Sequence, residues 1–279
     1  MRFCGFRITT DSLPSRWAFN PETANMSDSN FRLDGRWALV TGSTHGIGKG
    51  IALELAAAGA NLIVHGRDAA AADEVCAAIR DLQREAVAVV TDLADPSARQ
   101  KFVEQTWRRH PIDVCVNNAG ADVLTGEAAD WSFGQKLERL WAVDALATIA
   151  LSREFGGRMR ERGQGAIVNI GWDQAETGMA GDNGEFFAAT KGAIISFTRS
   201  LAKSLAPQVR VNCVAPGWIR TAWGDTASDY WQRRVVEESL MRRWGEVEDI
   251  AQAVRFLASP AASFITGQII PVNGGRADH

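Results

Sequence analysis

The sequence predicts a three-layer α/β fold in which a seven-stranded parallel sheet carries helices on both faces. Seven short runs rich in Val, Ile and Leu alternate with longer segments of helical character. These runs are continuously apolar and do not alternate with polar residues, which is the pattern of strands buried on both faces. Because strands separated by helices run parallel and connect by right-handed crossovers, the alternation indicates one doubly covered sheet.

The expected elements follow one another from residue 36 onward. The strands are RWALVTG (36–42), NLIVHGR (61–67), AVAVVTDL (86–93), IDVCVNNAG (112–120), GAIVNIGW (165–172), VRVNCVAPG (209–217) and QIIPVNGG (268–275). The helices lie between them, at about 47–59, 68–84, 96–109, 130–162, 185–205 and 246–258. Asp68, Pro96 and the acidic turn from Glu246 to Asp249 are typical helix starts.

No linker or repeat divides the chain, so residues 31–279 are expected to form a single domain. Residues 1–30 are polar, carry two prolines among Ser and Asn, and lack a continuous apolar run. We expect a flexible N-terminal extension there, with an upstream misassigned start or an ordered surface strap as alternatives. The Trp-rich segment at about 218–244 follows a strand end, as a substrate-covering segment would.

The composition bears on whether the protein binds nucleic acid, a membrane or a metal ion. The net charge of −3 disfavours a general nucleic-acid surface, and no run approaches the ~18 apolar residues of a membrane span. The four cysteines are scattered, and three of them lie in apolar segments, which fits buried, reduced thiols in a cytoplasmic protein. The four histidines show no metal-ligand spacing, so no metal site is expected.

A glycine-rich turn follows the first strand and opens the first helix. Glycines at this spacing let backbone N–H groups and the helix N-terminus approach a pyrophosphate, and the strand–turn–helix context supports dinucleotide binding. The residues predicted to bind the pyrophosphate are Gly42, Ser43, Thr44, His45, Gly46, Ile47 and Gly48.

The end of the second strand bears on which dinucleotide binds. An NAD site usually has an acidic residue here for the ribose 2′-hydroxyl, whereas this strand ends in His65, Gly66 and Arg67. The Arg67 guanidinium could accept a 2′-phosphate, and His45 could assist it. Asp68 follows, but it also suits a helix cap. The pattern favours NADP(H) over NAD(H).

Several motifs together resemble the short-chain dehydrogenase/reductase family, in particular its 3-oxoacyl-carrier-protein reductase branch. They are Thr41-x3-Gly46-x-Gly48, Asp92-Leu93, Asn117-Asn118-Ala119-Gly120, Pro216-Gly217 with Thr221, and the closing run from Thr266 to Gly275. The resemblance spans residue 35 to about 276 and implies the Rossmann fold. It also implies a homo-oligomer, a tetramer or a dimer, formed through the helices at 130–162 and 185–205.

The resemblance implies a role for each matching residue in cofactor binding. Asp92 and Leu93 would flank the adenine, and the backbone of Asn118, Ala119 and Gly120 would line the ribose. Ile170 and Lys191 would lie at the nicotinamide and its ribose. The residues implied at the carboxamide side are Pro216, Gly217, Ile219 and Thr221.

The catalytic positions depart from the family pattern. A tyrosine donates the proton in this family, and here that position is Phe187, four residues before Lys191. The serine position is Trp172, and the asparagine position is Asp144, which is expected to pair with Lys191. Dienoyl-coenzyme-A reductases, a branch of the same family, also lack this tyrosine, so the departure need not abolish hydride transfer.

Three other side chains could replace the missing phenol as proton donor. Asp173 is the first choice, because a carboxyl group desolvated beside aromatic rings has a raised pKa. Glu185 is the second choice, and Tyr230 could reach in from the covering segment. The alternative for the carboxyl groups is that they belong to a solvated loop, and for Tyr230 that it is a packing or rim residue. Trp172, Trp218, Trp223 and Trp231 would crowd the site, either stacking on a flat substrate or filling the pocket outright.

Two functions remain open from the sequence. The first is an NADP(H)-dependent oxidoreductase with an atypical active site, acting on a small carbonyl, hydroxyl or enoyl compound. The second is a catalytically silent nucleotide-binding sensor or oligomer subunit. An enzyme needs an open pocket beside the nicotinamide, whereas a silent subunit could pack Trp172 and Phe187 over that space.

Overall fold

The computed structural model describes residues 29–276, apart from the side chain of Trp223. A seven-stranded sheet in the order β3-β2-β1-β4-β5-β6-β7 runs through its centre, and every strand pair is parallel. The strands are β1 (Trp37–Val40), β2 (Asn61–Gly66), β3 (Ala86–Val90), β4 (Val114–Asn117), β5 (Gly165–Ile170), β6 (Val209–Pro216) and β7 (Ile269–Val272). The predicted fold class is therefore confirmed. The predicted extension covers 1–30, and its first 28 residues lie outside the described part.

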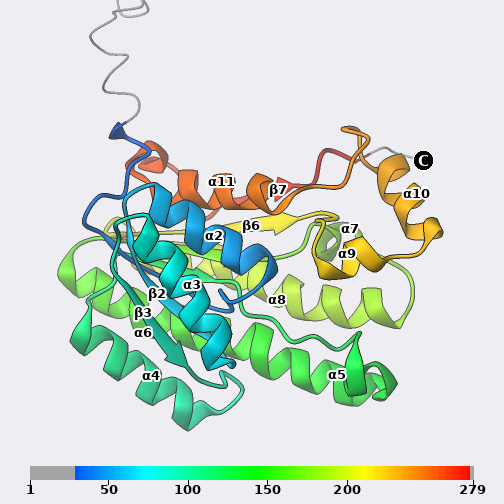
Figure 1. The fold of residues 1–279 in the computed structure, drawn as a ribbon, viewed down its shortest axis with the longest axis horizontal. Helices are drawn as coiled ribbons and strands as arrows, with labels where there is room; N and C mark the ends of the chain where they lie inside the picture. The colour runs from blue at the N-terminus through cyan, green and yellow to red at the C-terminus, as the bar shows by residue number, and fades with distance from the viewer. Residues whose placement is uncertain (1–28, 277–279) are drawn as a thin grey trace, which may run out of the picture.

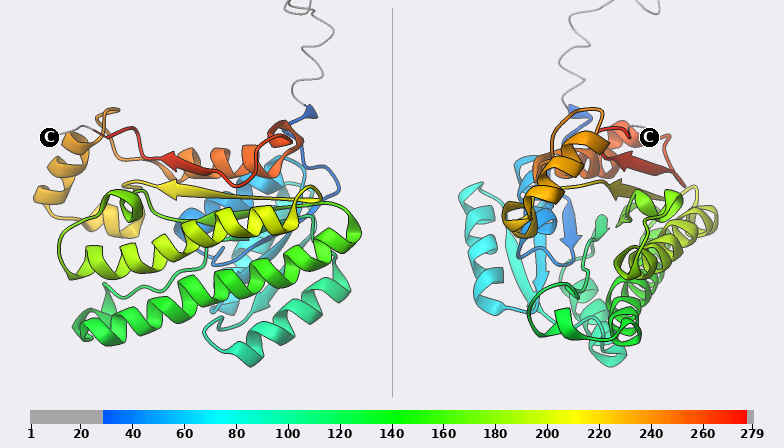
Figure 2. Two further views of the ribbon diagram at one scale, coloured as in Figure 1. Left: turned by 180° about the vertical axis from the view of Figure 1, so that it is seen from behind. Right: turned by 90° about the vertical axis from the view of Figure 1, so that its right-hand side faces the viewer.

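Helices cover both faces of the sheet (Figures 1 and 2). The helices on one face are α2 (Gly46–Ala57), α3 (Ala69–Asp81) and α11 (Val247–Ala258). Those on the other face are α4 (Pro96–Arg109), α6 (Ala147–Arg162) and α8 (Asp182–Leu205). One buried apolar cluster lies between the sheet and the helices on each face. Successive side chains of a strand point to opposite faces, so strands β1 to β6 contribute to both clusters. Each of these strands therefore packs against apolar side chains on both faces of the sheet, as its continuous run of apolar residues predicted.

The helix predicted over 130–162 is not uniform. It consists of α5 (Phe133–Leu140), a π-helical segment (Trp141–Leu146) and α6, after a short 3₁₀ turn (Gly126–Asp130). A π-helical turn has i→i+5 hydrogen bonds, so it rotates the residues within it relative to the flanking helix. Asp144 lies in this segment and is 2% exposed.

The observed strands end earlier than predicted at their carboxyl ends. β1 ends at Val40, and β3 ends at Val90, two residues before Asp92. The extra predicted residues belong to the turns that leave the sheet. β1 lies between β2 and β4, where the strand order reverses, and ligands of such sheets bind outside the carboxyl ends at this point.

The segment after β6 lies at the same carboxyl edge of the sheet (Figure 1). It contains α9 (Ala222–Thr226) and α10 (Asp229–Glu238), and the short α7 (Gln174–Thr177) lies nearby in the turn after β5. A last 3₁₀ turn (Pro260–Ala262) precedes β7. Within residues 29–276, no helix combines the length and apolar character that crossing a bilayer requires.

Candidate active site

The glycine turn between β1 and α2 leaves room for a ligand because side chains are excluded from it. Gly42 has a φ of +63°, which is strained for any residue with a Cβ. A Cβ at Gly48 would lie 2.1 Å from the Gly42 carbonyl oxygen and 2.4 Å from Asn118 Nδ2. The turn therefore needs glycine at both positions, and it presents the N-terminus of α2 to the cleft.

The turn is held by the residues that follow β4. Asn118 Nδ2 donates to the carbonyl oxygens of Thr41 and Gly42, at 3.0 and 3.1 Å. Thr41 Oγ1 accepts from the backbone N–H groups of Asn118 and Ala119, both at 3.0 Å. The two motifs that the sequence placed at the cofactor thus also fix each other.

His65 is a structural support for the turn that the sequence analysis did not assign. Its Nδ1 accepts the Gly42 N–H at 3.1 Å, so the ring proton lies on Nε2, which donates to the Thr91 carbonyl oxygen at 3.1 Å. Burial lowers the pKa of His65 to about 4. The neutral ring therefore connects the glycine turn to β2 and to the end of β3.

A cleft of about 650 Å³ follows the carboxyl ends of β1 to β4. The predicted cofactor residues that line it are Gly42, Thr44, His45, Ile47, Gly48, Arg67, Asp92, Leu93, Asn118, Ala119, Gly120 and Thr221. Ser43 and Gly46 are not among its lining residues, and the buried Ser43 hydroxyl accepts the His65 N–H at 3.0 Å. Arg139, which the sequence analysis missed, also lines the cleft and pairs with Asp92 at 3.3 Å.

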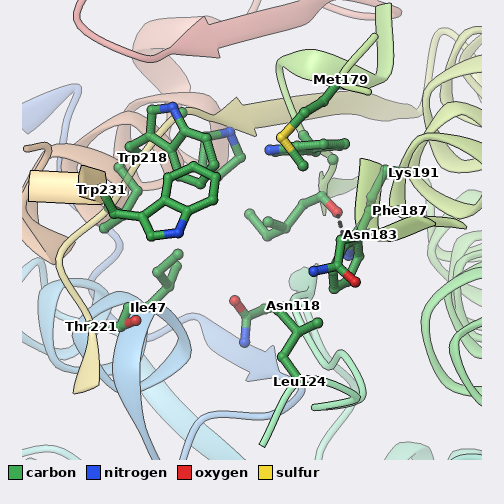
Figure 3. A pocket seen from close by; sticks show the side chains of 16 residues that line it. Ile47, Asn118, Leu124, Met179, Asn183, Phe187, Lys191, Trp218, Thr221 and Trp231 are labelled. Atoms are coloured by element: carbon green, nitrogen blue, oxygen red, sulfur yellow. Dashed lines mark hydrogen bonds between the residues drawn. The ribbon is translucent and has the colours of Figure 1, made fainter. Parts of the chain in front are cut away.

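A second cavity of about 360 Å³ adjoins the cleft and shares Ile47, Asn118 and Thr221 with it (Figure 3). The positions implied at the nicotinamide line this cavity: Ile170, Lys191, Pro216, Gly217, Ile219 and Thr221. Trp172 and Phe187 line it as well, with their ring centroids 6.1 Å apart. These two rings border the space and leave it open.

One face of α8 supplies three of the lining side chains. Asn183, Phe187 and Lys191 are spaced four residues apart, so they lie above one another on the helix and all point toward the cavity (Figure 3). The phenyl ring of Phe187 has no proton to donate to a ligand in this cavity.

The predicted ion pair between Lys191 and Asp144 is present. Lys191 Nζ lies 2.9 Å from Asp144 Oδ2, and the two side chains are 13% and 2% exposed. Asp144 Oδ1 also accepts the Ala121 N–H at 2.8 Å, and Lys191 Nζ makes a long contact of 3.5 Å with the Ile170 carbonyl oxygen. The carboxylate therefore balances the charge of the lysine at the edge of the cavity.

Asp173 does not face the cavity, which corrects the expectation that it stands beside the nicotinamide. Its backbone N–H donates to the Pro216 carbonyl oxygen at 3.1 Å, and the chain turns there into α7, for which Asp173 is the N-cap residue. Trp172 faces the cavity, whereas Asp173 Oδ2 accepts from Asn273 Nδ2 at 3.1 Å on the other side. Burial does raise the pKa of Asp173, as predicted, but away from the site.

The other two candidate donors also lie outside the cavity. Glu185 is exposed and does not line it. Tyr230 is 57% exposed on the outer side of α10, although its neighbour Trp231 does line the cavity. Among the lining residues in the described part of the chain, Lys191 is the one ionisable side chain.

Comparison with known proteins agrees with this geometry. Residues 42–277 match the sequence profile of the enoyl-(acyl carrier protein) reductase family. A protein of Arabidopsis thaliana named short-chain dehydrogenase/reductase SDRA is 33% identical over 249 residues, covering 88% of this chain and 95% of the relative. The chain belongs to the short-chain dehydrogenase/reductase family.

Further members of the family are similarly close. The 3-oxoacyl-[acyl-carrier-protein] reductase FabG of Aquifex aeolicus is 36% identical over 252 residues, which cover 88% of this chain and 98% of the relative. A 3-oxoacyl (acyl-carrier-protein) reductase of Agrobacterium tumefaciens, solved with NADP bound, superposes with a TM-score of 0.81 at 31% identity. That match covers 89% of this chain and 96% of the solved one. The resemblance inferred from the motifs is thus confirmed.

Proposed function

We propose that this protein is an NADP(H)-dependent oxidoreductase whose proton donor is the ammonium group of Lys191 and not a phenol. The observation that carries this proposal is the open cavity of about 360 Å³ beside the nicotinamide-side residues. A silent subunit has no need for such a space, and the substitutions at Trp172 and Phe187 leave it unfilled. A hydride acceptor could therefore be held there.

The residues present fit a dinucleotide. The glycine turn forms a cradle that a Cβ at Gly48 would fill, and the adjoining cleft has room for the adenosine half. Arg67 is exposed and lines the cleft at the end of β2. The Asp68 carboxylate caps α3, accepting from the N–H groups of Ala70 and Ala71 at 2.9 and 3.3 Å. Because Asp68 is used as a helix cap, Arg67 is the charged residue at the end of β2 that can contact a 2′-phosphate. This favours NADP(H), and the Agrobacterium reductase was solved with NADP bound.

A bound nicotinamide dinucleotide supplies the hydride in reduction and accepts it in oxidation. The protein's own residues bind and orient the substrate beside it, and Lys191 Nζ gives a proton to the substrate atom that becomes negative. Asp144 Oδ2 holds the ammonium at the cavity edge by their 2.9 Å contact. Solvent then returns the proton to Lys191, so one hydride and one proton are added to each substrate molecule.

Paired measurements of binding and turnover test this proposal. We expect NADPH to bind and to be oxidised by at least one compound in a panel of carbonyl and enoyl substrates. Lys191→Met should lower turnover at least 100-fold. The control Lys203→Met removes an exposed lysine from the same helix and should not change the rate. NADPH binding without any turnover would favour the alternative, a silent nucleotide sensor or oligomer subunit.

The cofactor preference has a separate test. Arg67→Ala should weaken NADPH binding about 100-fold and leave NADH binding within about twofold, because only NADPH carries the 2′-phosphate. Isothermal titration calorimetry with both coenzymes measures this difference. An equal loss of affinity for NADPH and NADH would mean that Arg67 does not contact the 2′-phosphate.

We also propose that the protein forms a homo-oligomer through the helices on the α4, α6 and α8 face. Phe133, Trp141 and Leu146 lie along α5 and the π-helical segment and are 39–42% exposed, although all three are large and apolar. Multi-angle light scattering should give a mass of two or four chains. A monomer at micromolar concentration would contradict this.

A further inference from the structure

We propose that the substrate is a flat, uncharged ring system held between two aromatic walls, with its reacting group toward Lys191 and no more than one further polar group, which Asn183 contacts. This inference rests on the proposed function, because it names the substrate class of the same cavity. It is carried by the lining side chains, by the way one wall is fixed, and by the charge balance at Lys191.

Two indoles form the wall on the α10 side. The ring centroids of Trp218 and Trp231 are 5.1 Å apart, and both rings border the open space opposite Phe187 and Met179 (Figure 3). Aromatic rings attract one another at centroid distances of about 4.5–7 Å in offset or edge-to-face arrangements. A flat ring entering this space therefore meets aromatic surface on one side, with Phe187, Met179 and Trp172 on the other.

The indole wall is fixed before any ligand arrives. Trp218 Nε1–H donates to Glu238 Oε2 at 3.0 Å, and Glu238 Oε1 pairs with Arg234 Nε at 2.6 Å. The guanidinium of Arg234 in turn lies 4.9 Å from the centre of the Trp231 ring. These contacts join both indoles to one glutamate on α10, so little conformational entropy is lost when a ring packs against them.

The charge of the cavity points to a neutral ligand. Its one ionisable side chain in the described part of the chain, Lys191, is already balanced by Asp144 at 2.9 Å. A carboxylate or ammonium on the ligand would lose hydration without gaining an unpaired counter-charge. The aromatic faces could attract a cation, but the Trp231 ring is already engaged by Arg234.

The other polar side chains of the lining are Asn118, Asn183 and Thr221, and Asn118 and Thr221 also line the adjoining cleft. Asn183 opens the α8 face that carries Phe187 and Lys191, and its side chain points into the cavity (Figure 3). Its amide carries two N–H donors and one accepting oxygen. One hydroxyl or carbonyl group on the ligand, besides the reacting group at Lys191, can bind this amide, whereas a polyhydroxylated sugar would leave several polar groups against apolar side chains.

Three small probes test this inference, measured by calorimetry on the full chain with and without NADP⁺. 2-Naphthol is flat and neutral, 2-naphthoate has the same rings with a charge, and trans-2-decalol has the same carbon count but is puckered. We expect 2-naphthol to bind at least tenfold more tightly than either of the others. Comparable or tighter binding of 2-naphthoate or decalol, or no binding of 2-naphthol, would overturn the proposal.

Two single substitutions on α10 test whether the indole of Trp231 contacts the ligand. Trp231→Ala should weaken 2-naphthol binding about tenfold, whereas Val236→Ala shortens an exposed side chain of the same helix that does not line the cavity and should change the affinity less than twofold. NADPH affinity should stay the same in both variants. Loss of 2-naphthol binding equal in both variants would contradict an indole wall. Failure of NADPH to bind while 2-naphthol still binds would count against the proposed function and not against this site.

Discussion

At the scale of residues, the phenyl ring of Phe187 decides which group in this site can donate a proton. Phe187 lies on the same helix face as Lys191 and lines the same cavity, at the position where the motif resemblance implies a tyrosine. The environment that would lower the pKa of a phenol, a cation one helical turn away, is still present. We therefore expect the site to be able to use a tyrosine hydroxyl at this position.

Phe187→Tyr tests whether the scaffold retains this ability. We expect the variant to reduce a simple ketone at least tenfold faster than the native protein, because a positioned acid contributes about 10²–10⁴-fold. The measurement is NADPH oxidation at 340 nm with saturating coenzyme. The control Phe186→Tyr changes the adjacent, fully buried ring and should give no gain. An unchanged rate for Phe187→Tyr would mean that the oxygen of the substrate is held elsewhere.

The buried pair of Lys191 and Asp144 makes a prediction about stability. Lys191→Met leaves the Asp144 carboxylate 2% exposed with only the Ala121 N–H as its partner, which should cost about 3–5 kcal/mol. The double variant Lys191→Met/Asp144→Asn removes the stranded charge, so it should be less destabilised than Lys191→Met alone. Urea unfolding of the native protein, Lys191→Met, Asp144→Asn and the double variant gives the four free energies. Additive losses would show that the two groups do not interact.

At the scale of elements, the glycine turn depends on contacts from three strands. The loop after β4 holds the turn through Asn118, and β2 and β3 hold it through His65. Since the Nδ1 atom of His65 accepts the Gly42 N–H, protonation of that atom would break the contact. The acid sensitivity of the turn is thus set by the imidazole.

The depressed pKa of His65 has a defined effect on stability. The imidazole binds its proton near pH 6.5 when the chain is unfolded but only near pH 4 in the fold. The unfolded state therefore binds more protons between these values, and the free energy of unfolding should fall by about 3 kcal/mol from pH 6.5 to 4. This contribution is complete above pH 6.5.

His65→Asn isolates that contribution, because an amide oxygen can replace Nδ1 as acceptor and does not titrate. The variant should lose less stability than the native protein between pH 6.5 and 4, by about the same 3 kcal/mol. Chemical denaturation at a series of pH values measures the two slopes. Parallel slopes for the two proteins would show that His65 does not carry the effect.

At the scale of the whole molecule, one cleft collects residues from both halves of the sheet. The turn after β1, the ends of β2 to β4 and the segment after β6 all reach it. A ligand that binds only the folded chain stabilises it by about 2.7 kcal/mol at a concentration of 100 Kd. NADPH should therefore raise the melting temperature by roughly 5 °C, since each kcal/mol shifts a large domain by about 2 °C.

Gly48→Ala tests whether this rise in melting temperature comes from NADPH bound at the glycine turn. Its Cβ would collide with the Gly42 carbonyl oxygen and the Asn118 amide, so the turn must shift away from its ligand-binding shape. The variant should lose most of the thermal shift with NADPH. The same shift in both proteins, followed by differential scanning fluorimetry, would mean that the dinucleotide binds outside the cleft.

Local patterns in the sequence determined the fold class and the outline of the site. Apolar runs and helical spacing fixed the strands and helices, since these depend on neighbours a few residues apart. The turn from Gly42 to Gly48 and the missing phenol at Phe187 could likewise be read from short motifs. The ion pair of Lys191 with Asp144 could be anticipated only because both positions matched a family pattern.

Only the tertiary structure decided which side chains meet in space. Trp172 and Asp173 are adjacent in sequence, but the chain turns from β5 into α7 at this point, and Trp172 lines the cavity whereas Asp173 contacts Asn273. His65 looked like an ordinary strand residue, because its partners lie 23 and 26 residues away. The open space beside Phe187 depends on how α8, β6 and α10 pack together, and no local pattern encodes such a packing of distant elements.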